Sequence, residues 1–261
     1  METHQYHSES SIEQYHWWFQ GRRKLLSTVL SDLKIKKDAY ILDIGCSSGT
    51  NLRCYETSGY RNYQPLDKSA EAASIIEEKG FNKAILGSAT DLPFGKDTFD
   101  FVSATDVLEH IDHDGKAIRE ILRVLKPNCK AYFTVPCHEF LWGSQDIISH
   151  HLRRYKRGEL KRKLRAHGFD IEREFYFNST LLIPILAVRL ITHLLFKLKI
   201  LSERESENEL TGNGLFNKIL SLLFGWECLL AYMASNKVPG VSCGCVAMKP
   251  SSERKKAMMQ L

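Results

Sequence analysis

Short apolar runs alternate with longer amphipathic segments from residue 39 to about residue 177. The apolar runs end at glycine, proline or aspartate, which is typical of strands buried on both faces of a parallel sheet. The segments between them have the spacing of helices that cross over such a sheet. We therefore predict strands at 39–44, 63–66, 84–86, 99–104, 130–135 and 171–177, and helices at 51–57, 70–78, 117–125 and 159–166.

The alternating pattern ends after residue 177. Two long apolar stretches follow, at 179–200 and 215–234, and a final strand is predicted at 241–248. Roughly sixty residues therefore separate the sixth strand from the seventh, far more than an ordinary loop contains. The pattern predicts an α/β fold with a doubly wound, Rossmann-like, seven-stranded and mostly parallel sheet, and a long helical insertion before the last strand.

The first apolar stretch of the insertion carries a basic stripe. Arg189, His193 and Lys197 recur every four residues, so they share one side of a helix that is otherwise apolar. A membrane-spanning helix would bury these side chains in hydrocarbon, at about 2.5–3.5 kcal/mol each. We therefore expect a helical pair that lies on a membrane surface or covers a cleft. A lid or a homodimer contact without lipid explains the insertion equally well.

Composition and charge fit a soluble globular protein. The chain has 261 residues, of which 43% are hydrophobic and 26% charged, and a net charge of +5. Its seven cysteines are scattered, which favours a reducing cytoplasmic compartment. Cys243 and Cys245 lack partners at metal-ligand spacing, so we expect no metal site. A basic run at 153–165 predicts a solvated face, or a site for anions such as pyrophosphate or lipid headgroups. No recognisable RNA-binding module accompanies it, so nucleic acid is not expected as a partner.

A loop of small residues, Asp43–Gly49, follows the first strand. Small side chains let the backbone approach a ligand, and the next helix offers unpaired N–H groups at its N-terminus. About twenty residues later Asp67 ends the second strand, where a carboxylate suits the two hydroxyls of a ribose. The loop lacks the third glycine that is typical of a nicotinamide dinucleotide site, so the spacing favours a smaller adenosine ligand.

Five segments, ILDIGCSSG, LDKS, GSATDLPF, TFDFVSATDVLEHI and RVLKPN, resemble in order and spacing the motifs of class I S-adenosylmethionine-dependent methyltransferases. The resemblance covers residues 39–135 and implies S-adenosylmethionine as cofactor and S-adenosylhomocysteine as product. By position it implies cofactor contacts for Asp43, Gly45, Cys46, Gly49 and Thr105 near the methionine, Asp67 at the ribose, and Lys68, Ser88 and Ala89 at the adenine.

Two positions depart from the family's usual pattern. Ser47 stands where members usually have glycine, so the turn there is expected to differ slightly. Ser88 stands where they usually have aspartate, and it can bond the adenine amine without carrying a charge. We therefore expect weaker cofactor affinity than in typical members.

Other segments resemble a methyltransferase type 11-like subgroup found among enzymes that tailor sugars and glycans. These are VPCHEFLW, the run from His151 to Tyr155 with an H-x-R-R-Y pattern, and YHWWF before Arg22. The resemblance implies His151 as the first candidate for a general base and His110 as the second. Equally good interpretations are that His151 anchors its loop and that His110 caps the following helix. Arg22 is expected to meet the methionine carboxylate from a helical lid.

The sequence thus predicts three regions: a helical lid at 1–36, a cofactor-binding methyltransferase domain at 37–178 plus 239–250, and an apolar helical insertion at 179–238. The predicted function is O-methylation of a sugar or lipid-linked glycan, by a cytoplasmic enzyme that is peripheral on the membrane. One alternative is methylation of a soluble small-molecule secondary metabolite. The other is a non-catalytic module that only binds S-adenosylmethionine.

Overall fold

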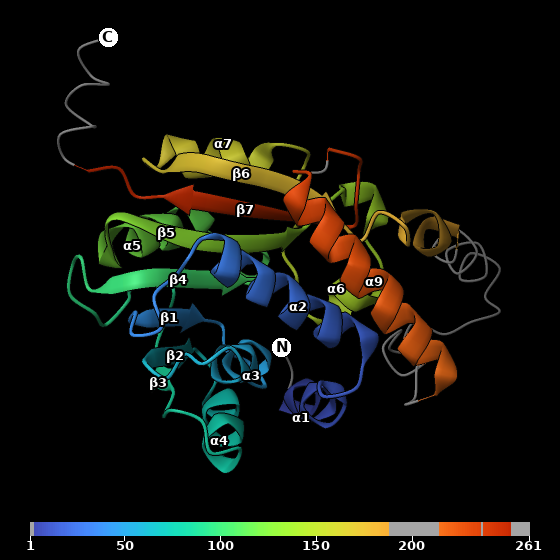
Figure 1. The fold of residues 1–261 in the computed structure, drawn as a ribbon, viewed down its shortest axis with the longest axis horizontal. Helices are drawn as coiled ribbons and strands as arrows, with labels where there is room; N and C mark the ends of the chain where they lie inside the picture. The colour runs from blue at the N-terminus through green and yellow to red at the C-terminus, as the bar shows by residue number, and fades with distance from the viewer. Residues whose placement is uncertain (1–2, 188–213, 236, 252–261) are drawn as a thin grey trace, which may run out of the picture.

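The computed structural model describes residues 3–187, 214–235 and 237–251. Within these residues one seven-stranded sheet has the order β3-β2-β1-β4-β5-β7-β6 (Figure 1). All neighbouring strands run parallel except β7, which is antiparallel to β5 and β6. The strands are β1 Ile41–Ile44, β2 Tyr63–Asp67, β3 Ile85–Leu86, β4 Phe99–Thr105, β5 Leu125–Pro136, β6 Asp170–Phe177 and β7 Ser242–Met248.

Helices lie near the four positions that the pattern predicts, and two more lie in the N-terminal region that was predicted to be helical. The short helix Ser144–Ile148 was not predicted. The predicted bounds 70–78 and 159–166 are those of α4 and α7. The helices are α1 Thr3–Ile12, α2 Trp17–Asp32, α3 Thr50–Thr57, α4 Ala70–Glu78, α5 Asp114–Val124, α6 Ser144–Ile148, α7 Glu159–Ala166 and α9 Leu215–Met233, with short 3-10 turns at Leu108–His110 and Glu139–Leu141.

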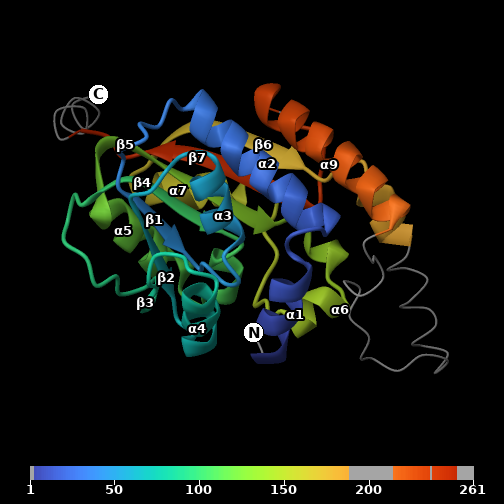
Figure 2. The same ribbon diagram turned by 60° about the horizontal axis from the view of Figure 1, so that its bottom comes forward.

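The sheet carries a hydrophobic layer on each face, because successive side chains of a strand point to opposite sides. On β4, Val102 belongs to the cluster that includes buried residues of α5 and α7. Its neighbour Phe101 belongs to the other cluster, which includes buried residues of α2, α3 and α9. The result is a three-layered arrangement with helices on both faces of the sheet (Figure 2).

The N-terminal aromatic segment and the insertion form one layer. Phe224 of α9 stacks on Trp18 of α2 with 5.2 Å between ring centroids. A Cβ atom on Gly21 would lie only 2.1 Å from the Phe224 ring, so glycine permits this close packing. At the start of α2, the Trp17 N–H donates to Oδ1 of Asn217 at 2.9 Å. Helices that the sequence assigns to two separate regions therefore pack as one unit across the sheet (Figure 1).

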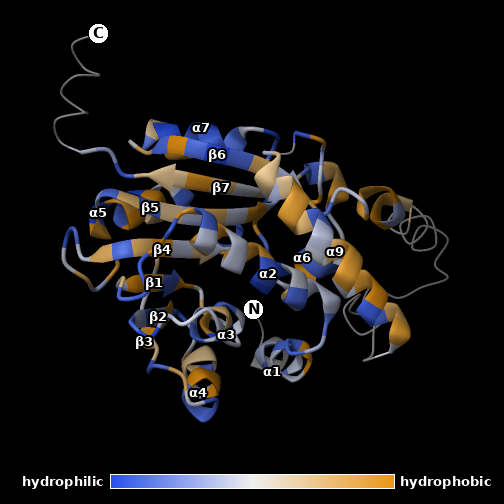
Figure 3. Ribbon diagram, in the orientation of Figure 1, coloured by the Kyte–Doolittle hydropathy of each residue, from blue (hydrophilic) through white to orange (hydrophobic). Residues whose placement is uncertain are grey.

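Many residues of α9 are hydrophobic (Figure 3), and several of its large apolar side chains are exposed. Among the described residues, α9 is the one helix long and apolar enough to cross a membrane by length and composition, and 33% of its apolar window is buried. The predicted stripe of Arg189, His193 and Lys197 lies outside the described residues. The large exposed apolar side chains of α9 are Leu215, Phe216, Ile219, Leu222, Leu223, Trp226, Leu230 and Met233.

Candidate functional site

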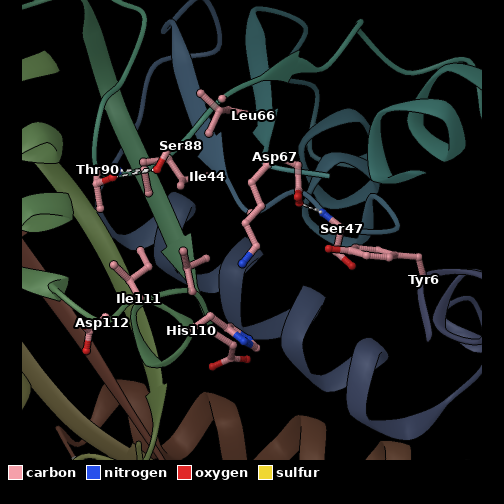
Figure 4. A pocket seen from close by; sticks show the side chains of 16 residues that line it. Tyr6, Ile44, Ser47, Leu66, Asp67, Ser88, Thr90, His110, Ile111 and Asp112 are labelled. Carbon is pink, nitrogen blue, oxygen red and sulfur yellow. Dashed lines mark hydrogen bonds between the residues drawn. The ribbon is translucent and has the colours of Figure 1, made fainter. Parts of the chain in front are cut away.

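A cavity of about 310 Å³ lies at the carboxyl ends of β1, β2 and β4 (Figure 4). Open α/β sheets bind their ligands at this edge, where the strand order reverses, and the volume falls within the range of small-molecule pockets, about 300–1,000 Å³. The sequence-predicted residues that line the cavity are Gly45, Asp67, Lys68, Ser88, Ala89 and His110.

Asp67 organises the loop after β1. Its Oδ2 accepts a hydrogen bond from the Ser47 N–H and its Oδ1 accepts one from the Ser69 N–H, both at 3.0 Å. Gly45 has a φ of +73°, and a Cβ there would lie 2.5 Å from Cγ2 of Val107. Ser47 adopts a φ of +44°, so the serine that replaces the usual glycine keeps the left-handed turn. The loop thus presents backbone and a carboxylate to the cavity.

Five other predicted cofactor residues do not line the cavity: Asp43, Cys46, Gly49, Thr105 and Arg22. Asp43 is fully buried, and its Oδ1 accepts hydrogen bonds from Asn51 at 2.9 Å and from the Tyr55 hydroxyl at 3.0 Å. Burial raises the pKa of the Asp43 carboxyl to about 6.

These residues support the loop from behind. Asn51 also donates to Oγ1 of Thr105 at 2.9 Å, which joins the start of α3 to the end of β4. Gly49 precedes α3 with a φ of +96°, a left-handed conformation that favours glycine. Cys46 is buried, and its burial raises the pKa of the thiol well above its usual value.

Arg22 of α2 is buried, and its partners in the structure are protein groups; its contact with the methionine carboxylate stays a prediction. The guanidinium donates to the carboxylate of Asp106 and, at 2.6 Å, to Oγ1 of Thr134. It also lies over the Trp18 and Phe177 rings, 5.4 and 5.5 Å from their centroids. Asp106 lines the cavity, so Arg22 acts on the site through this carboxylate. Sequence reasoning missed Asp106, although it directly follows the predicted Thr105.

The N-terminal segment is attached to the same loop. Tyr6 of α1 lines the cavity. Glu13 is fully buried; its carboxylate accepts from the hydroxyls of Ser48 and Thr50 at 2.8 Å and pairs with Lys79 Nζ at 2.8 Å. No local sequence pattern marks Tyr6 or Glu13, because their contacts join segments far apart along the chain.

The two predicted bases lie together, but only His110 lines the cavity, whereas His151 lies behind it. The rings of His110 and His151 meet edge to face, with 4.8 Å between their centroids. Nδ1 of His151 lies 2.8 Å from Oδ1 of Asp146, which also accepts from Nε of Arg154 at 2.8 Å. Burial, together with the proximity of His151, lowers the pKa of His110 to about 4. His110 is therefore neutral near pH 7 and a weak proton acceptor, whereas His151 has an orienting carboxylate.

This geometry agrees with a comparison to known families. A model of the methyltransferase domain matches residues 14–174, well over half of the chain. The chain belongs to this family. The methyltransferase sheet order and the site at the ends of β1 and β2 make it a class I, S-adenosylmethionine-dependent methyltransferase in fold and cofactor.

Named relatives differ in their acceptors. The chain is 30% identical over 117 residues to the demethylmenaquinone methyltransferase of Bacillus velezensis, covering 42% of this chain and 50% of that protein. It is 32% identical over 121 residues to the norajmaline N-methyltransferase of Rauvolfia serpentina, covering 43% and 41%. The chain spans about half the length, or less, of the curated relatives it matches.

Solved structures confirm the fold. The complex between the Haloferax volcanii Trm112 methyltransferase activator and a methyltransferase contains a chain that matches with a TM-score of 0.61 and 18% identity, over 94% of both chains. A phosphoethanolamine N-methyltransferase from Haemonchus contortus, solved with S-adenosylhomocysteine, matches with a TM-score of 0.57 and 21% identity, over 87% of this chain and 53% of that one.

The residues of the cavity fit S-adenosylmethionine. The Asp67 carboxylate can accept from both ribose hydroxyls, and the φ of Gly45 lets the main chain approach the ligand. Ser88 and Ala89 line the same cavity as Asp67 and Lys68.

Proposed function

We propose that this protein transfers a methyl group from S-adenosylmethionine to a hydroxyl of an acceptor held beside His110 and His151. One observation carries the proposal: the cavity is lined by Asp67, which suits the ribose, and by His110, whose ring contacts His151, and the buried Asp146 carboxylate orients His151. A methyl donor at one end and a group able to take a proton at the other are what O-methylation requires.

The bound cofactor supplies a methyl group that its sulfonium charge already activates. The protein's own residues then align the acceptor and take up its proton. We predict that His151 accepts this proton, because Asp146 both fixes the ring and stabilises the imidazolium that forms. His110 stays neutral and bonds the acceptor oxygen. Tyr6 and α1 cover the cofactor and exclude water from it.

The acceptor we propose is a sugar or a lipid-linked glycan at a membrane surface. The exposed apolar side of α9 supports this, because contiguous exposed apolar side chains mark contact sites for lipid or protein. Flotation with anionic vesicles tests the membrane part: the chain should float, and replacing Leu222 and Leu223 by Glu should abolish flotation. The double variant Ser74→Glu and Asn82→Glu, which adds the same charge at exposed positions away from α9, is the matched control. If the native chain does not float, the acceptor is a soluble metabolite and the insertion is a lid.

A transfer assay tests the reaction itself. Purified protein, methyl-labelled S-adenosylmethionine and a membrane extract should give a labelled, lipid-soluble product together with S-adenosylhomocysteine. Label found only in a water-soluble product supports the soluble-metabolite alternative. If calorimetry shows that the cofactor binds but neither fraction supports turnover, the module is non-catalytic and the proposal is wrong.

A further inference from the structure

A buried carboxylate lies beside His110, which lines the cavity, and the described part of the structure leaves this carboxylate without a partner. Glu109 precedes His110 and is fully buried, and neither of its carboxylate oxygens has a hydrogen-bond partner among the described residues. Such a group destabilises the fold unless it is compensated, so a purely structural role explains it poorly.

Two imidazole rings lie beside this carboxylate. One oxygen of Glu109 and one nitrogen each of His110 and His151 all lie within 4.8 Å of one another. Ligands bound at about 2.1 Å around one ion are separated by about 3–3.5 Å, so side-chain rotations of about 1 Å would bring the three together. Two imidazoles and a carboxylate suit first-row transition ions better than magnesium or calcium, which prefer oxygen ligands alone.

The surroundings hold His151 in the way that metal-binding histidines require. Nδ1 of His151 bonds Asp146, which Arg154 holds in place, so Nε2 of His151 is left to face the cluster. The ring of His110 packs edge to face against the ring of His151, with 4.8 Å between the centroids. A carboxylate behind a histidine fixes its tautomer and its orientation, a recurrent feature of metal sites.

We propose that Glu109, His110 and His151 bind one divalent first-row transition ion, such as Zn²⁺ or Mn²⁺. Three protein ligands leave at least one open coordination position, and that position faces the cavity because His110 lines it. The positive ion also compensates the buried Glu109 carboxylate, which the protein alone leaves unpaired.

This inference rests on the proposed function for the nature of the acceptor, and it changes how His151 contributes. An acceptor hydroxyl in the open position would lose its proton to solvent water more readily, because a bound cation lowers the pKa of an attached oxygen. The acceptor oxygen then forms the bond to the methyl carbon while the carbon–sulfur bond breaks. With the ion bound, the two histidines act as ligands and the cation activates the acceptor.

Metal binding can be measured without any acceptor. The untagged full chain is stripped with EDTA, dialysed against Zn²⁺, Mn²⁺ or Co²⁺ alone, and its metal content is measured by mass spectrometry. We expect about one ion per chain and visible absorption bands from Co²⁺. The variants His151→Ala and Glu109→Gln should each weaken binding at least about 10-fold. His113→Ala, on an exposed side chain of the same segment, is the matched control and should bind like the native chain.

The possible outcomes separate this inference from the proposed function. Failure to retain any of the three ions, or equal binding by folded His151→Ala protein, would overturn the metal site and leave His151 as a general base. Far-UV circular dichroism verifies that each variant is folded. Stoichiometric binding lost in both ligand variants supports the site, even if methyl transfer to the tested acceptors fails. Circular dichroism and S-adenosylmethionine binding of the stripped chain report on the fold and the cofactor end separately.

Discussion

The two ends of the cavity are built in different ways. The cofactor end uses a short loop and the end of a neighbouring strand, where Asp67 accepts from the main chain of Ser47 and Ser69. The acceptor end uses side chains from loops after two different strands, His110 after β4 and His151 after β5. A motif of local sequence can specify the first end. Only the packing of the whole domain can assemble the second.

The largest expected effect is at the acceptor end. His151→Gln should lower kcat by about 100- to 10,000-fold, because it removes the group that deprotonates the acceptor or holds the ion that does so. Calorimetry should show unchanged S-adenosylmethionine affinity, since His151 does not line the cofactor end of the cavity. His113→Gln is the control. A joint loss of turnover and cofactor affinity would show that the two ends are not separable.

Asp67→Ala probes the opposite end. Losing a charged hydrogen-bonding partner costs about 1.5–3 kcal/mol, so S-adenosylmethionine should bind about 10- to 100-fold more weakly. Turnover at saturating cofactor should fall much less than in His151→Gln. Titration calorimetry and steady-state kinetics measure the two quantities. Unchanged affinity would mean that the cofactor lies elsewhere, and the assignment of this cavity would be wrong.

The pH dependence of stability tests the buried Asp43 carboxyl, which lies behind the loop after β1. Burial raises the pKa of Asp43 from 3.8 to about 6 in the folded chain, so its ionisation disfavours the folded state. The native chain should therefore lose up to about 3 kcal/mol relative to Asp43→Asn as the pH rises from about 4 to about 6, and no more above that. Urea unfolding of both proteins at pH 4, 5, 6 and 7 measures this difference. A constant difference would contradict it.

The smallest expected effect is a change in the free energy of unfolding when Ser47, which departs from the family pattern, is replaced by glycine. Ser47 occupies a left-handed conformation, which costs a residue with a side chain about 1–2 kcal/mol relative to glycine. Ser47→Gly also removes a hydrogen bond of 3.2 Å from its hydroxyl to Glu9. We expect a net gain of about 1 kcal/mol in the free energy of unfolding, with little change in kcat. Thermal and urea melts check the sign, and a loss of stability would show that the bond to Glu9 outweighs the strain.

The sequence was sufficient to predict the sheet and the cofactor loop. Strand and helix periodicity depends on residues close along the chain, so α4 and α7 could be placed within their observed bounds. The loop at Gly45 and the carboxylate of Asp67 could be placed for the same reason, because each lies directly at the end of a predicted strand. Asp43 and Thr105 were placed at the right strand ends, but they lie behind the cavity because their side chains pack into hydrogen bonds there.

Only the tertiary structure decided which residues and elements, distant in sequence, lie beside one another. Three features join residues that are distant in sequence. They are the contact of Glu13 with the cofactor loop, the layer that α2 and α9 share, and the cluster of Glu109, His110 and His151. Periodicity along the chain reports which side of an element is buried, but not which other element covers it. The sequence therefore determined the fold and the cofactor class, whereas the acceptor chemistry depends on side chains that only the folded domain brings together.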